Sequence, residues 1–248
     1  MHGTGGSSAG VAGVSETPRP LQYILADPYD RLAIEIDSVP GFEPRAPVEA
    51  LLVDRLAQIL DKPGGIRVLH DESLDDPGHG HAWTFEELRA LGDATFDPAP
   101  RDGEIRIHVM FVDGGYTSPD SGATVLGLAW GNTHIAVFEE TIAKGCRSTG
   151  LGLTDVLDDR ACADAQYGIW LHEVGHVLGL VDNGLAMVEP HQDAEHPAHD
   201  ASEDCIMYWA YEGTPLFDRI AAALRGDMPR VDFDANCLAD IAAAKTAP

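Results

Sequence analysis

The amino-acid sequence predicts an α+β fold in which a mixed five-stranded sheet packs against helices. The chain has 248 residues, and 44% of them are hydrophobic, which suits one large domain or two small lobes sharing a cleft. Segments typical of strands and helices alternate through the first part of the chain, and a long apolar helix follows them. This order fits a mixed sheet with helices packed on it.

Taken in order, five segments have the alternation or the β-rich composition of strands: 31–38, 66–69, 104–112, 125–129 and 134–138. Apolar residues at helical spacing predict helices over 47–60, 159–178, 215–224 and 234–245. A further short helix should begin after Thr84, because Glu87 stands three residues later and completes a capping box. The polar, glycine-rich segments 71–81 and 113–123 are predicted loops.

Residues 1–20 are rich in Gly, Ser and Ala and lack the apolar region of a signal peptide, so we interpret them as a disordered tail or linker. We expect an N-terminal subdomain over 21–180, which holds the sheet and the long apolar helix. A smaller C-terminal subdomain should follow over 181–248.

The charge of the chain excludes several partners. The net charge is −25, from 41 acidic and 16 basic residues, and a field of that sign repels phosphate backbones and anionic membranes. We therefore expect no nucleic-acid binding. No apolar run approaches the length that spans a bilayer, so no transmembrane segment is predicted.

The most informative stretch is 169–180, IWLHEVGHVLGL, which contains the pattern H-E-x-x-H. His172 and His176 are four residues apart and share one face of a helix, so both imidazoles can bind one metal ion. Glu173 lies beside the metal but outside its ligand set, where a general base for water belongs. Its apolar neighbours indicate a buried helix, and Gly179 is the expected C-cap.

A catalytic zinc ion usually has three protein ligands and one open position. The segment from His172 to Gly179 resembles the metzincin metalloprotease signature, H-E-x-x-H-x-x-G-x-x-H, which is followed by a turn that contains a methionine. Asp182 stands at the position of the third histidine. In the snapalysin-like branch of the family an aspartate takes this place, so Asp182 is one candidate for the third ligand.

A second candidate lies further along the chain. The segment 199–208, HDASEDCIMY, resembles matrixins and archaemetzincins, in which the third histidine stands eight residues before the methionine of the turn. His199 and Met207 have this spacing. Cys205 is also similar to archaemetzincins, whereas Asp200 replaces the cysteine that follows their third histidine.

We favour His199 as the third zinc ligand because the downstream match includes several residues and imidazole is the commoner ligand; Asp182 and His191 are the alternatives. The resemblance implies a metzincin-like fold, with a twisted sheet, an active-site helix and a smaller C-terminal subdomain that carries the Met-turn. It also implies that Tyr208 and Trp209 line the pocket for the substrate residue after the scissile bond.

These residues predict a zinc-dependent peptidase that acts on a peptide or protein substrate. Zinc would lower the pKa of a water from near 15.7 towards about 7, and Glu173 would accept the water proton and pass it to the leaving amine. The alternative is a non-catalytic, zinc-stabilised module that binds peptides or proteins. No oligomeric state is predicted.

The four cysteines and two further histidines lie outside the H-E-x-x-H pattern. No C-x-x-C is present, and the preferred pairing is Cys146–Cys162 and Cys205–Cys237, although four buried thiols are also compatible. We expect a secreted or cell-envelope protein. His79 and His81 could form a small auxiliary metal site, but a loop without ligands is the favoured interpretation.

Overall fold

The structure, a computed structural model, describes residues 17–97, 102–119, 121–147 and 155–246. Its helices are α1 (Pro20–Ile24), α2 (Ala46–Ile59), α3 (Phe85–Thr95), α4 (Glu139–Arg147), α5 (Asp155–Val177), the 3-10 helix η1 (Trp209–Glu212), α6 (Pro215–Arg225) and α7 (Ala235–Thr246). Its strands are β1 (Arg31–Ser38), β2 (Ile66–Ser73), β3 (Glu104–Val112), β4 (Tyr116–Thr117), β5 (Thr124–Val125), β6 (Gly127–Trp130) and β7 (His134–Phe138).

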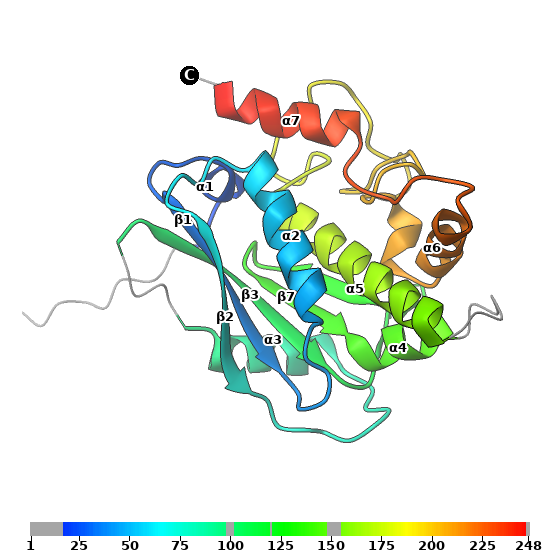
Figure 1. The fold of residues 1–248 in the computed structure, drawn as a ribbon. Coiled ribbons are helices and arrows are strands. Elements are labelled where there is room, and N and C mark those ends of the chain that lie inside the picture. Colours follow the sequence, from blue (N-terminus) through cyan, green and yellow to red (C-terminus); the bar gives the residue numbers. More distant parts are fainter. Residues whose placement is uncertain (1–16, 98–101, 120, 148–154, 247–248) are drawn as a thin grey trace, which may run out of the picture.

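The main sheet has five strands in the order β2-β1-β3-β7-β6 (Figure 1). The first four strands in this order are mutually parallel, and β6 runs antiparallel to β7 at one edge. The short strands β4 and β5 form a separate antiparallel pair. The predicted fold class, a mixed sheet with packed helices, is therefore confirmed.

Helices cover both faces of this sheet, with α2 and α5 on one face and α3 on the other (Figure 1). Strand β3 is buried along its whole length, so it contributes to both faces. Ile107 and Val109 belong to the core under α2 and α5, whereas Met110 and Val112 pack in the core that contains Leu88 of α3. Alternation along a strand produces this division.

Most predicted elements are confirmed. The predicted strands 31–38, 104–112 and 134–138 coincide with β1, β3 and β7, and the helices predicted in the second half match α5, α6 and α7 with small changes at their ends. The Thr84 side chain accepts the N–H of Glu87, and the Glu87 carboxylate accepts the N–H of Thr84, as a capping box requires. Gly179 has φ of +72° and follows the end of α5 as the predicted C-cap.

Two strands were predicted with wrong boundaries. Strand β2 continues to Ser73, which pairs with Ser38 of β1, so sheet pairing overrides the polar composition that predicted a loop. The predicted strand 125–129 is divided between β5 and β6 at Leu126. The N–H of Leu126 donates to the carbonyl of Glu212 (2.7 Å), and its carbonyl accepts the N–H of Phe138 (3.0 Å).

Two α-helices, α1 and α4, were not predicted. Helix α1 has one turn and begins at Pro20, which is buried and packs close to Gly179, so the predicted tail ends in packed structure. The rest of that tail, residues 1–16, lies outside the described residues. Helix α4 follows β7 without a connecting loop. Its first turn is acidic and its last turn is basic, an arrangement that complements the helix dipole.

The cysteine prediction is correct for one pair. Cys146 of α4 and Cys162 of α5 form a disulfide. The second predicted disulfide is absent: the Sγ atoms of Cys205 and Cys237 are buried 3.6 Å apart as free thiols. The fold therefore brings this pair together without a bond between the two sulfur atoms.

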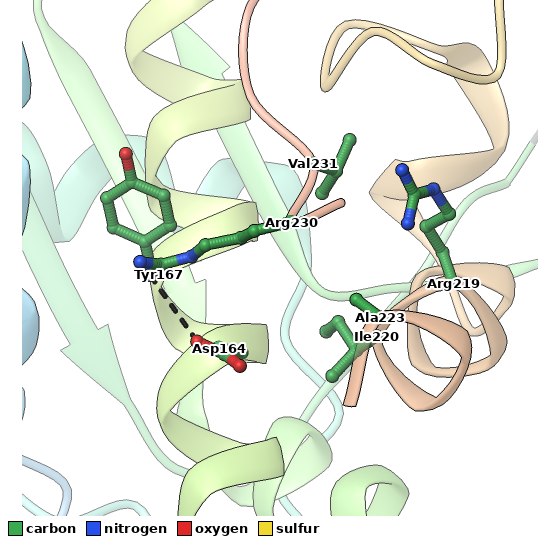
Figure 2. A pocket seen from close by; sticks show the side chains of 7 residues that line it. All are labelled: Asp164, Tyr167, Arg219, Ile220, Ala223, Arg230 and Val231. Carbon is green, nitrogen blue, oxygen red and sulfur yellow. Dashed lines mark ion pairs between the residues drawn. The ribbon is translucent and has the colours of Figure 1, made fainter. Parts of the chain in front are cut away.

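The predicted subdomains, 21–180 and 181–248, contribute to one hydrophobic cluster, and α7 packs near α1 and α2 (Figure 1). Figure 2 shows part of the seam between α5 and the C-terminal segment, where the Arg230 guanidinium lies 4.0 Å from the centroid of the Tyr167 ring. Arg230 also pairs with Asp164 at 3.4 Å. No helix among the described residues is long and apolar enough to cross a membrane.

The buried ammonium group of Lys62 holds the segment that leads into strand β1. Lys62 is 7% exposed, and its Nζ donates hydrogen bonds of 2.6–2.7 Å to the backbone carbonyls of Gln22, Leu25 and Tyr29. Burial lowers the pKa of Lys62 to about 8, so the group remains charged at pH 7. This side chain therefore provides hydrogen-bond donors for three carbonyl groups in α1 and in the segment that joins α1 to β1.

We predict that Lys62→Met lowers the free energy of unfolding by about 2–4 kcal/mol, because three carbonyl groups lose a charged donor. Urea unfolding of the variant measures this change. Lys245→Met is the matched control, because Lys245 is exposed near the end of α7, and it should unfold at the wild-type urea concentration. Equal midpoints for the two variants would contradict the role of Lys62.

Candidate metal centre

Helix α5 carries three functional side chains into the interior. His172 is fully buried, Glu173 is 1% exposed, and His176 is partly buried one turn later. The Nε2 atoms of His172 and His176 lie 3.1 Å apart. The helix spacing thus produces the paired imidazoles that the H-E-x-x-H pattern predicts.

The structure brings His199 to the same point. Its imidazole stacks against that of His172, with ring centroids 5.4 Å apart, and it lies 4.9 Å from the ring of His176. Glu212, at the end of η1, joins them, and the four side chains place one ligand atom each within 4.8 Å of one another. The Glu212 Oε1 atom lies 2.8 Å from His199 Nε2, 3.5 Å from His176 Nε2 and 3.7 Å from His172 Nε2.

Backbone carbonyls fix the tautomers of two of these histidines. His172 Nδ1 lies 2.7 Å from the carbonyl of Ile206, and His199 Nδ1 lies 3.0 Å from the carbonyl of Pro197. A carbonyl oxygen only accepts hydrogen bonds, so each Nδ1 carries the hydrogen. In the neutral rings, both Nε2 lone pairs therefore point toward the centre of the cluster, as metal-binding histidines require.

His176 is uncharged at neutral pH. Burial lowers its pKa to about 4, with a further contribution from the neighbouring imidazoles, although Glu212 acts in the opposite direction. An imidazole must be neutral to bind a metal ion. This histidine is therefore in a ligating state at pH 7.

The ligand atoms of the cluster are chemically suited to a metal ion. The Nε2 lone pairs of His172 and His199 lie 3.7 Å and 2.8 Å from the Glu212 carboxylate, but acceptors repel unless a proton or cation lies between them. Three imidazoles and a carboxylate are a ligand set typical of zinc and other borderline divalent ions.

The alternative third ligands lie elsewhere. Asp182 is exposed and has φ of +59° in the turn after α5. His191 is buried between two carboxylates, with Nδ1 2.5 Å from Asp200 Oδ2 and Nε2 2.9 Å from Asp240 Oδ2. The structure brings neither Asp182 nor His191 into the four-residue cluster.

Glu173 lies against the edge strand of the sheet. A Cβ atom on Gly127 of β6 would approach the Glu173 side chain to 2.8 Å, so glycine at this position leaves room for the carboxylate. Oε1 of Glu173 is buried and has no hydrogen-bond partner among the described residues. Burial, and then the charge of Glu212, raises the pKa of Glu173 well above its usual range, despite a hydrogen bond from the Ala129 backbone.

Met207 packs beneath the two helix histidines. It is fully buried, and its Sδ atom would lie 2.3 Å from a Cβ on Gly175, which stands between His172 and His176. The N–H of Asp200 donates to the Met207 carbonyl at 2.8 Å, which joins the segment after His199 to this turn. Gly175 and Met207 thus set the separation between α5 and the turn.

Two cavities lie beside β6, and residues of the cluster line each of them. On one side lies a cavity of about 650 Å³ whose lining includes Leu128, His199, Trp209 and Glu212. On the other side, a smaller cavity of about 190 Å³ is lined by residues that include His176. Tyr208, one of the two predicted pocket residues, instead packs its ring near those of Trp209 and Tyr211 and does not line the larger cavity.

Sequence reasoning missed Glu212, whereas Trp209 is one of the two residues that the resemblance places in the substrate pocket. Glu212 stands five residues after Met207, in a segment that was interpreted only as following the turn. Trp209 stacks on His196, with ring centroids 4.1 Å apart, and both line the larger cavity. The Trp-Ala-Tyr-Glu segment is short and has no periodic signal, so only its place in the fold reveals the role of Glu212.

Neither a protein-family model nor a curated protein sequence matches this chain. Among solved structures, the fold is similar to archaemetzincin from Methanopyrus kandleri, with a TM-score of 0.54 and 14% identity over 89% of this chain and 98% of that chain. A zinc-dependent peptidase from Methanocorpusculum labreanum has a TM-score of 0.48 and 18% identity, with 84% and 99% of the chains covered. The first likeness shows that this chain shares the fold of archaemetzincin.

We predict that Gly175→Ala lowers the free energy of unfolding by about 1–3 kcal/mol, because the new methyl group overlaps Met207. Gly168→Ala is the control on the same helix, where a Cβ meets Leu216 at an ordinary 3.5 Å. That variant should gain about 0.5–1 kcal/mol, because alanine is the better helix former. Urea unfolding compares the two, and equal effects would contradict the Met207 contact.

Proposed function

We propose that this chain is a zinc-dependent peptidase in which His172, His176 and His199 bind zinc and Glu173 is the general base. The observation that carries the proposal is the convergence of three Nε2 atoms beside a buried, unpaired carboxylate oxygen. The fold that this chain shares with archaemetzincin agrees with the proposed function. The motif helix and the segment that holds His199 and Met207 take part in one site.

Zinc in this cluster would supply a Lewis acid that lowers the pKa of water and polarises a peptide carbonyl. The protein supplies the proton transfer. Glu173 is buried next to the cluster, and burial stabilises its protonated form, so a proton taken from water is retained until the leaving amine accepts it. The same environment excludes bulk water from the carboxyl group.

The edge strand and the larger cavity beside the cluster suit an extended peptide. Strand β6 is the edge of the sheet, and an edge strand can pair with a substrate backbone by β-augmentation. The larger cavity lies beside His199 and is bounded by Leu128 and Trp209, so it would accept an apolar substrate side chain. Trp209, which the resemblance also places in this pocket, lines the cavity, whereas Tyr208 packs behind it against Trp209 and Tyr211.

We further propose that Met207 has the role of the Met-turn methionine, and that the protein is exported. The first proposal is supported by the contact of Met207 with Gly175 between the two histidines. The second is supported by the disulfide of Cys146 and Cys162, since disulfides persist mainly in oxidising compartments.

Glu212 favours a second candidate function. Its carboxylate lies among the three imidazoles, so it could complete a four-ligand shell, and a closed shell is typical of structural zinc. The protein would then be a zinc-stabilised module that binds peptides without cleaving them. Peptidase action requires that Glu212 leave one metal position open.

We predict that Glu173→Gln retains zinc but hydrolyses a denatured protein substrate about 10²–10⁴-fold more slowly than wild type, because the general base is lost. Cleavage is measured by mass spectrometry of the products, and zinc by elemental analysis. Glu189→Gln, at an exposed position, is the control and should keep wild-type turnover.

Undiminished turnover in Glu173→Gln would refute the role of this residue. A zinc-loaded wild type without any cleavage of a denatured protein would favour the binding module instead.

A further inference from the structure

A second group of carboxylates lies at the carboxyl end of the sheet. Strands β3 and β7 are parallel neighbours that end together, with Val112 paired to Phe138. Asp113 follows β3 directly, and Glu140 lies in the first turn after β7. The loop after β2 adds His79, and the three side chains place one ligand atom each within 4.8 Å of one another.

Asp113 is the unusual member of this group. It is fully buried, yet neither of its carboxylate oxygens has a hydrogen-bond partner among the described residues. Its backbone is held firmly: the carbonyl accepts the indole N–H of Trp83 at 2.8 Å, and the next residue, Gly114, would clash with the carbonyl of His81 if it had a Cβ. An unpaired buried carboxylate is costly unless a cation or a proton neutralises it.

Glu140 is oriented toward the same space. Its Oε2 accepts the N–H groups of Gly80 (2.9 Å) and Gly114 (2.7 Å), which fixes the carboxylate. Its Oε1 lies 2.8 Å from the exposed Lys144 ammonium and 3.8 Å from His79 Nδ1. Oε2 is thus held by the backbone, and Oε1 faces the cluster while it pairs with the exposed Lys144 ammonium.

Negative charge accumulates at this point. Burial raises the pKa of Asp113, and the nearby carboxyl of Asp76 and the charge of Glu140 raise it further. A proton shared between Asp113 and Asp76 would relieve this repulsion in acid. A divalent ion would relieve it at neutral pH, where carboxylates are otherwise ionised.

We propose that a divalent metal ion binds between Asp113, Glu140 and His79, at a site that shares no residue with the histidine cluster of α5. The carboxylates suit any divalent cation, but calcium and magnesium prefer oxygen ligands, whereas imidazole suits zinc. The imidazole of His79 therefore makes Zn²⁺ the expected ion. His81, which was considered with His79 as a ligand, instead lies 3.7 Å from Glu87.

The test is a zinc titration of the full chain after removal of metal with a chelator. Equilibrium dialysis should show that Asp113→Asn binds one zinc ion fewer than wild type. Asp75→Asn, an exposed residue of the same loop, should bind as many as wild type. His79→Ala should weaken zinc binding at this site and leave calcium binding there unchanged.

Thermal unfolding separates ion binding from a purely structural role of Asp113. Without metal, Asp113→Asn should be at least as stable as wild type, because the amide removes the unpaired charge. With zinc at a hundredfold excess over its Kd, the wild-type Tm should rise by about 5 °C or more above that of the variant.

A second variant covers the case in which Asp113→Asn does not fold. Glu140→Gln keeps an oxygen acceptor for the two backbone N–H groups and removes the charge, and it should lose the same ion. The proposal is overturned if either folded variant binds as many zinc ions as wild type. Unchanged zinc affinity in His79→Ala would overturn the assignment of His79.

Discussion

His172, His176 and His199 present their Nε2 atoms to one another in the interior of the protein, and Glu212 adds a carboxylate oxygen to the same point. Hydrogen bonds from two of the Nδ1 atoms to backbone carbonyls leave lone pairs directed inward. These groups repel one another unless a positive charge lies between them. The helix, the β6 edge and the segment from His199 to Glu212 are arranged around this cluster, and the proposed zinc ion would supply the positive charge.

The surroundings make this arrangement rigid. Helix α5 is covered by the parallel strands and by α2, and a disulfide to α4 ties its first half. Beneath the histidines, Gly175 and Met207 are in such close contact that the turn cannot shift along the helix. Ligands held on packed elements need little reorganisation when an ion binds, which favours affinity and a defined geometry.

The fold was largely predictable because its signals are local. Alternation in β1 and β3, the capping box at Thr84 and the helical spacing of His172 and His176 each depend on residues close in sequence. Outside α5, the site was predictable only where a recognisable motif continues along the chain, as for His199. Glu212 could not be found, because its place beside the histidines depends on the bridge between Leu126 and Glu212, a contact distant in sequence. The sequence likewise predicts Asp113 only as the start of a loop, because its burial depends on contacts that involve Trp83 and Gly114.

The measurement that tests the account most directly is the zinc content of the purified chain by elemental analysis, for wild type beside His199→Ala and Asp182→Ala. We expect His199→Ala to bind one zinc ion fewer than wild type and Asp182→Ala to bind the wild-type number, because only His199 lies in the cluster. A full complement of zinc in His199→Ala, or no zinc in wild type, would contradict the assignment of this cluster as the metal centre.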